Sequence, residues 1–428
     1  MLEQAITRAR RRLLPFLLLM YVLAFLDRAN IGFAKESFQA STAISDGAYA
    51  LGAGLFFLTY SLFEIPSNLI MHRIGARLWM CRIMVSWGLI SAAMALVTSE
   101  MSFYILRLLL GAAEAGFFPG VILYLTYWFP DRVRGQMMGL FYFGAPAAFI
   151  VGGPLSGLLL EMDGFAGFLG WQWMFLIEGL LASAVGIWAY FYLNNGPADA
   201  KWLPEDERQA LAAEIARENH ARARAGPVTL SKTVLNPRVA LFVSIYFLIQ
   251  MSVYGVIFYL PTQVGAMMGR KVGFEVGVVT AIPWICAMIV TFLLTRWADR
   301  SRKHRSLAVA ALLMSAAGIA ISADSPPFIA LIALCLAASG FIAAQPLFWT
   351  FPTSYLGGAA AAGGIALINA LGALGGFVAP NVKTWAEGNF DSSDAGLYLL
   401  AVTTVIGALL FLAIRQTGAA ASPAHSVR

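Results

Sequence analysis

Six charged residues interrupt long apolar stretches of the sequence. They are Asp27, Arg28, Glu64, Arg107, Glu114 and Glu178. An ionised side chain surrounded by hydrocarbon costs several kcal/mol unless it is paired or reaches water. A carboxyl group in such a place can also lower this cost by taking up a proton. These six residues are therefore the first candidates for binding an anion and for carrying protons.

Spacing along a helix limits which of these residues can act together. Arg107 and Glu114 are seven residues apart, so two helical turns return them to nearly the same face, about 10 Å apart along the axis. Asp27 and Arg28 are adjacent, so a helix projects them about 100° apart. One of this adjacent pair can face a neighbouring helix while the other faces a cavity.

The composition indicates which solvent surrounds these residues. Of the 428 residues, 59% are hydrophobic and only 12% are charged, whereas a soluble domain carries roughly 25% charged residues. A soluble protein this apolar could not cover its own surface, so the lipid bilayer is the expected partner. Helices are the default way to cross it, because backbone groups in lipid must be satisfied within the segment.

The sequence contains no motif for a metal, a nucleotide or a catalytic nucleophile. Its three cysteines lack C-x-x-C spacing, and its four histidines do not cluster with cysteines or carboxylates at metal-ligand spacing. A Walker A loop, a dinucleotide fingerprint and a G-x-S-x-G elbow are also absent. We therefore expect no metal, no cofactor and no catalytic residue, and we predict that the protein is not an enzyme.

Twelve apolar segments are long enough to cross a bilayer as helices. They lie at roughly 13–35, 49–71, 79–98, 103–128, 136–160, 172–193, 238–261, 276–296, 307–322, 328–352, 361–385 and 395–415. A polar stretch between the sixth and seventh contains an amphipathic helix pattern. The prediction is an all-α membrane protein with an N-terminal six-helix half (1–193), a cytoplasmic linker (194–237) and a C-terminal six-helix half (238–428).

Most of the 29 lysine and arginine residues fall in the N-terminal arm, the linker, the tail and the connections after the second, fourth and eighth segments. Because positive residues accumulate on the cytoplasmic side, this bias predicts that both termini are cytoplasmic. It also explains the net charge of +6 without nucleic acid as a partner. Basic connections recur at 68–79 and 295–305, the same place in each half, which is typical of a parallel-repeat transporter with its site between the halves.

Several longer motifs resemble the major facilitator superfamily, and within it the anion:cation symporter family of organic-acid transporters. They are FLDRANIGFA at 25–34, YSLFEIPSNLIMHRIGARLW at 60–79, RLLLGAAEAGFFPGVILYLTYWFP at 107–130, GWQWMFLIEG at 170–179 and FWTFP at 348–352, with Asn369 beyond them. The resemblance covers essentially the whole chain. It implies a bacterial-type inner membrane protein that functions as a monomer.

In this superfamily the first and fourth helices line the cavity. That placement predicts that Asp27 pairs with Arg107 and leaves Arg28 free for a substrate carboxylate, which its planar guanidinium can bind through two hydrogen bonds. The resemblance also implies that Asp27 and Glu114 are the protonation sites and that Arg107 couples them. The competing interpretation is a set of permanent salt bridges that only orient helices. For Glu64 and Glu178 we favour such structural or gating contacts.

Further substrate-binding positions follow from the resemblance and from helical spacing. They are Tyr60, Tyr246, Gln250, Tyr254, Gln345, Trp349, Thr350 and Asn369. Tyr246, Gln250 and Tyr254 are spaced by four and share a helix face. For each aromatic residue among them, packing is the alternative role. Ala145 stands where sugar-acid members carry a glutamine, which favours an aromatic acid or a short dicarboxylate over a polyol.

The combined prediction is a proton-coupled symporter that imports a small organic anion, a mono- or dicarboxylate, by alternating access. The proton gradient supplies the energy. Anion exchange and sodium coupling on the same fold remain alternatives. A nutrient sensor built on a transporter fold is disfavoured, because the polar stretch at 194–237 is too short for a signalling domain.

Overall fold

The structure, a computed structural model, describes residues 1–224, 236–356 and 359–414. Its helices are α1 (Leu2–Thr42), α2 (Asp46–Ile74), α3 (Ala76–Ala93), α4 (Glu100–Glu114), α5 (Phe117–Trp128), α6 (Asp131–Tyr142), α7 (Gly144–Leu160), α8 (Gly170–Tyr192), α9 (Glu205–Arg224), α11 (Pro237–Ile257), α12 (Leu260–Met268), α13 (Phe274–Ser301), α14 (His304–Ala323), α15 (Pro327–Tyr355), α16 (Ala359–Ala373), α17 (Gly375–Phe390) and α18 (Ala395–Leu412). In these ranges, twelve helical spans are long and apolar enough to cross a membrane, and each overlaps one predicted segment. The predicted all-helical fold is confirmed.

Proline and glycine divide several spans near their middle. The fourth span breaks between α4 and α5, where Gly116 has φ +86° and Pro119 follows three residues later. Pro119 has no N–H for the carbonyl of Ala115, so the helix cannot continue through this point. The break makes Glu114 the last residue of α4. Pro261 has the same effect between α11 and α12, because it leaves the carbonyl of Ile257 without a helical donor.

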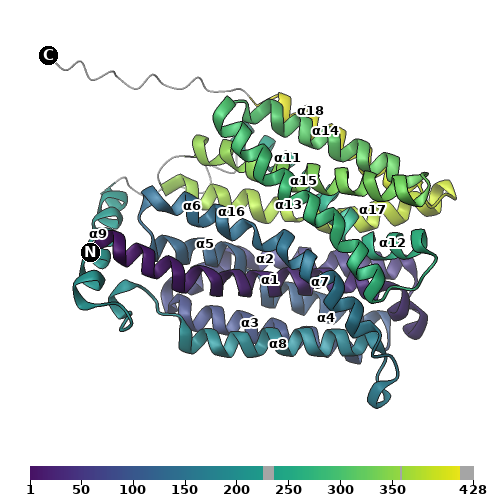
Figure 1. The fold of residues 1–428 in the computed structure, drawn as a ribbon, viewed down its shortest axis with the longest axis horizontal. Coiled ribbons are helices and arrows are strands. Elements are labelled where there is room, and N and C mark those ends of the chain that lie inside the picture. Colours follow the sequence, from purple (N-terminus) through teal and green to yellow (C-terminus); the bar gives the residue numbers. More distant parts are fainter. Residues whose placement is uncertain (225–235, 357–358, 415–428) are drawn as a thin grey trace.

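The helices form two groups that follow the order of the chain (Figure 1). In the first group α3 packs on α8 and α2 on α4, and in the second α14 and α13 pack on α15. The groups meet where α7 contacts α13, where α2 contacts α16 and α17, and where α1 contacts α12. α9 lies beside the N-terminus at one end of the bundle, where Arg8 forms an ion pair with Glu207 at 3.1 Å. Residues 225–235 of the predicted linker lie outside the described residues.

Glycines bring the two groups into backbone contact at the end of the bundle away from α9. A Cβ atom on Gly153 of α7 would lie 2.4 Å from the carbonyl oxygen of Gly277 on α13. One turn further along α7, a Cβ on Gly157 would lie 2.4 Å from the carbonyl oxygen of Gly273. Such approaches are possible only without side chains. This contact holds α7 and α13 together at that end.

Candidate substrate site

A cavity of about 430 Å³ lies between the two groups of helices. Gly135, Asp299 and His304 line it toward the end of the bundle that carries α9. The first turn of α6 is fixed to α9 at that end, where the backbone N–H of Asp131 donates to Glu218 at 3.0 Å. The cavity lining therefore extends toward the α9 end, whereas α7 and α13 are in backbone contact at the opposite end.

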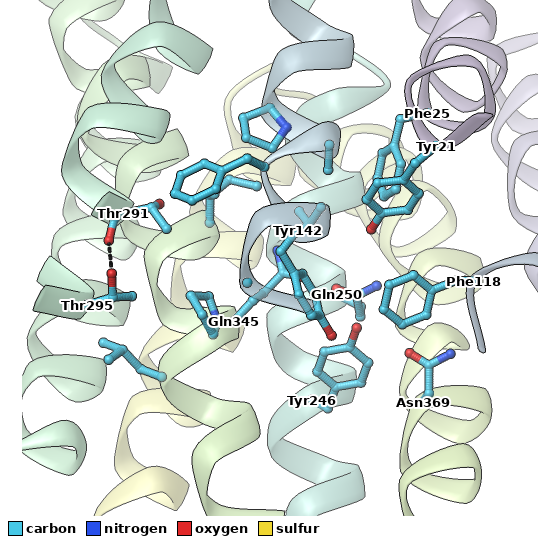
Figure 2. Close-up of a pocket in the computed structure, with 18 of the residues that line it drawn as sticks. Tyr21, Phe25, Phe118, Tyr142, Tyr246, Gln250, Thr291, Thr295, Gln345 and Asn369 are labelled. Carbon is cyan, nitrogen blue, oxygen red and sulfur yellow. Dashed lines mark hydrogen bonds between the residues drawn. The ribbon is translucent and has the colours of Figure 1, made fainter. Parts of the chain in front are cut away.

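Eight of the nine predicted substrate-binding residues line this cavity. They are Arg28, Tyr60, Tyr246, Gln250, Tyr254, Gln345, Thr350 and Asn369. Figure 2 shows the side chains of Tyr246, Gln250, Gln345 and Asn369 pointing into one common space. The spacing by four on α11 therefore did place its three polar residues on the cavity face.

Trp349 does not line the cavity. Its ring packs behind Tyr246, with the ring centres 4.9 Å apart and nearly perpendicular. The neighbouring residue Thr350 does line the cavity, and adjacent residues on a helix project about 100° apart. The direct contact of Trp349 with substrate therefore stays a prediction, and in this structure its ring contacts Tyr246.

One part of the cavity wall is aromatic and was not predicted from the sequence. It consists of Tyr21, Phe25, Phe118, Tyr142 and Phe149. Tyr21 and Phe25 precede Arg28 by seven and three residues on α1, which is the spacing of one helix face. That spacing is the sequence signal that would have identified Tyr21 and Phe25 as cavity residues. Ala145 also lines the cavity, as its predicted role in substrate choice requires.

Arg28 is the central charged residue of the site, and it is paired. Its Nε and Nη2 atoms lie 2.7 and 2.5 Å from Oε1 of Glu114, and its Nη1 donates to the hydroxyl of Tyr254 at 3.2 Å. The guanidinium also stands 4.8 Å from the centre of the Tyr60 ring. The expectation that Arg28 is free for substrate is therefore corrected, because Glu114 at the end of α4 occupies two of its nitrogen atoms.

Asp27 and Arg107 do not form the predicted ion pair. Asp27 faces α3, where it accepts hydrogen bonds from the hydroxyl of Ser91 and, within α1, from Nδ2 of Asn30 at 3.3 Å. Arg107 donates to the backbone carbonyls of Gly52 and Ala53 on α2, at 3.2 and 2.9 Å. The predicted 100° separation of Asp27 from Arg28 holds, but the helix that Asp27 faces is α3 and not α4.

The four carboxyl groups inside the bundle share one property. Asp27, Glu64, Glu114 and Glu178 are buried, and within the described residues each has one carboxyl oxygen without a hydrogen-bond donor. The second oxygen of Glu178 accepts from Ser156 at 2.8 Å, and that of Glu64 from Asn369 at 2.8 Å. A buried oxygen without a donor is a place where a proton can bind at low cost.

A twelve-span helical bundle with a largely apolar cavity around Arg28, between two groups of helices, is the architecture of a membrane transporter. The chain belongs to the Major Facilitator Superfamily, whose sequence model matches residues 17–380. This confirms the predicted superfamily and the prediction of a transporter rather than an enzyme.

Several relatives match nearly the whole chain. The "Inner membrane transport protein RhmT" of Escherichia coli K12 is 48% identical over 427 residues, 99% of both chains. A "Putative tartrate transporter" of Agrobacterium vitis is 42% identical over 407 residues, 95% of this chain and 90% of that protein.

Solved structures share the fold. A bacterial homologue of the human lysosomal transporter Spinster, in an inward-facing and occupied conformation, has a TM-score of 0.73 at 16% identity and covers 94% of this chain and 96% of its own. The D-xylose-proton symporter gives the same TM-score, identity and coverage. At this identity the likeness establishes the fold alone.

Proposed function

We propose that this protein imports a small organic anion together with protons by alternating access between the two groups of helices. The observation that carries the proposal is the Arg28–Glu114 pair at the cavity wall. Arg28 lines the cavity, whereas Glu114 lies behind it and is fully buried. The guanidinium can therefore exchange one carboxylate partner for another without leaving its place.

The coupling follows from this competition. An ionised Glu114 holds Arg28 through a hydrogen bond from Nε and an ion pair with Nη2, and it leaves little binding capacity for a second carboxylate. A proton on Glu114 removes that negative charge and allows Arg28 to bind the carboxylate of the substrate. Proton and anion therefore bind together and leave together, which is the requirement for symport.

Asp27 acts as a second protonation site in this proposal. It lies next to Arg28 in α1, and among the described residues its hydrogen-bond partners, Ser91 and Asn30, are neutral. Arg107 helps to determine its charge through space rather than by direct contact. Tyr60, Tyr246, Gln250, Tyr254, Gln345, Thr350 and Asn369 contact the remainder of the substrate, and Trp349 supports Tyr246.

The anion is a mono- or dicarboxylate, and an aromatic acid or a short dicarboxylate fits best. The aromatic wall suits a planar ring; it consists of Tyr21, Phe25, Phe118, Tyr142 and Phe149. Ala145 has no amide group to bind the hydroxyl groups of a polyol. A relative with the name of a tartrate transporter supports the short dicarboxylate. The basic residues near α9 support an orientation with this end and both termini on the cytoplasmic side of a bacterial inner membrane. In this proposal the protein works there as a monomer.

The test has two stages. A thermal-shift screen of the purified protein against carboxylates identifies ligands, because binding to the native state raises the apparent stability. Uptake of the best ligand into proteoliposomes is then measured with an imposed proton gradient, with and without sodium. Accumulation that follows the proton gradient supports the proposal. Accumulation that requires sodium, or that requires a counter-anion inside, establishes one of the alternatives instead.

A further inference from the structure

Within the described part of the chain, Glu64 is linked to the cavity by a hydrogen bond to one lining residue. It lies on α2, its side chain is completely buried, and Nδ2 of Asn369 on α16 donates to its Oε1 at 2.8 Å. Asn369 lines the cavity, whereas Glu64 does not. A second bond, from the hydroxyl of Ser61 to the backbone carbonyl of Ala370 at 2.6 Å, joins the same two helices nearby. Glu64 thus contacts the second group of helices at a residue of the substrate site.

The charge of Glu64 determines which end of the Asn369 amide it binds. An ionised carboxylate can only accept hydrogen bonds, so its partner must present an N–H. The amide oxygen of Asn369 is then left for the cavity. Figure 2 shows this arrangement, with the oxygen on the side of Tyr246 and the nitrogen turned away. An oxygen in this position accepts a hydrogen bond from a hydroxyl group and repels a carboxylate.

Protonation of Glu64 reverses the preference. A protonated carboxyl group carries one O–H donor, and the amide oxygen is the acceptor that complements it. The Oε2 atom of Glu64 is buried and has no donor in the described part of the chain, so it is the oxygen that receives the proton. Because Oε1 and not Oε2 faces Asn369, half a turn of the carboxyl group about its Cγ–Cδ bond first directs the new O–H, which otherwise has no acceptor, toward the amide. Rotation of the amide about its Cβ–Cγ bond then brings its oxygen to that O–H and turns an N–H into the cavity.

We propose that Glu64 is a positioning residue that converts its own protonation into a change of polarity at the substrate site, by turning the amide of Asn369 from an acceptor into a donor. The proposal rests on the proposed function, in that the ligand favoured by the turned amide is an organic anion. It adds a second proton-linked element to the pair of Arg28 and Glu114. It also assigns Asn369 a different task in each state, binding a hydroxyl in one and a carboxylate in the other.

The surroundings of Glu64 are compatible with a change of charge. In the described residues, the titratable groups that face it are Arg28 from α1, Tyr60 from α2 itself and Tyr246 from α11. Of these only Arg28 carries a charge, and it is already paired with Glu114. No dedicated cation therefore holds Glu64 in its ionised form.

Infrared difference spectroscopy of the purified full-length protein, recorded between alkaline and acidic pH, tests the proposal without any substrate. Acidification should produce a carboxyl band together with a change in a side-chain amide band. The amide band is assigned with isotopically labelled asparagine. We expect Glu64→Gln to remove one component of the carboxyl band and the linked amide change, and Asn369→Leu to remove the amide change. Ser61→Ala, which breaks the neighbouring bond between the same helices, should leave both unchanged.

A labelled amide change that persists in Glu64→Gln would overturn the proposal, because Asn369 would then not respond to Glu64. Isotope labelling of the unsubstituted protein keeps the test valid if Asn369→Leu does not fold, since an unperturbed asparagine band on acidification gives the same negative answer. The outcome is separable from that of the proposed function. A protein that shows the amide change but takes up no carboxylate disproves the transport proposal alone, and proton-driven uptake without the amide change disproves this inference alone.

Discussion

Neutralising Glu114 should separate anion binding from proton coupling. In Glu114→Gln the side chain keeps its shape but cannot hold Arg28 by charge, so Arg28 is available to a substrate carboxylate at every pH. The variant should therefore bind the anion with an affinity that depends on pH less than that of the parent, the remaining dependence coming from Asp27 and Glu64. It should also exchange labelled for unlabelled anion across the membrane, yet fail to accumulate anion when a proton gradient is imposed.

The geometry sets the size of the effect. Two Arg28 nitrogen atoms contact Oε1 of Glu114 at 2.7 and 2.5 Å. A hydrogen bond to a charged group contributes about 1.5–3 kcal/mol net. Two unit charges about 4 Å apart attract by about 4 kcal/mol at an effective dielectric constant of about 20. The competition removed by the substitution is therefore about 1.5–4 kcal/mol. At alkaline pH this corresponds to a gain in anion affinity of about tenfold to a thousandfold.

The assay compares two kinds of uptake in the same proteoliposomes. Gradient-driven accumulation reports coupling, whereas counterflow with an equal pH on both sides reports binding and the movement of the helices. Glu100→Gln is the matched control, because it neutralises an exposed residue at the first position of the same helix α4. If Glu114→Gln still concentrates the anion like the parent, the competition for Arg28 is not the coupling step and the reasoning fails.

Three further predictions concern coupling, closure and substrate choice. Asp27→Asn should lose gradient-driven uptake and retain counterflow in the same assay, and unchanged accumulation would exclude Asp27 as a protonation site. Gly153→Val should reduce transport but not ligand-induced thermal stabilisation, because its side chain would meet the backbone of Gly277. The overpacking, about 1–3 kcal/mol, disfavours the close contact of α7 with α13. Gly388→Val is the control and should be neutral, because no atom lies within 4 Å of its Cβ position. Equal losses of transport in both variants would refute a role for the contact of α7 with α13. Ala145→Gln should bind a sugar acid about fivefold more tightly than the parent, for one added hydrogen bond of about 1 kcal/mol, and an unchanged thermal shift would contradict its role in substrate choice.

The sequence was sufficient to predict the spans, the cavity-lining face of α11 and the separate directions of Asp27 and Arg28. Each of these follows from hydrophobicity or from the angle between helical positions, which are local properties. The partners of the charged residues were predicted wrongly, because Arg107 and Glu114 share one face of α4 and either could meet α1. The depth at which α1 crosses α4 decides between them, and that depth depends on packing throughout the bundle.

Trp349 and Glu64 also have contacts that local sequence could not predict, although neither contact is an ion pair. Whether Trp349 or Thr350 faces the cavity depends on the rotation of α15 by a fraction of a turn, and hydrophobicity does not specify that rotation. Glu64 meets Asn369 across 305 positions of the chain, and no pattern in either segment relates them. The sequence indicated that Glu64 needed a partner, because it is an acid in an apolar span, but only the packed structure supplied that partner.

The charge balance of the cavity explains why an anion should travel with protons. Of the described residues that line the cavity, Arg28 is the charged residue deep in the wall. Asp299 and His304 lie toward the α9 end. Glu114 already neutralises Arg28. An anion that enters therefore adds a charge without a counter-charge, in a space where desolvation makes such a charge costly. A proton on Glu114 restores the balance for one carboxylate. For the second carboxylate of a diacid, protonation of Glu64 turns the Asn369 amide into a donor and at the same time removes a negative charge from the neighbourhood.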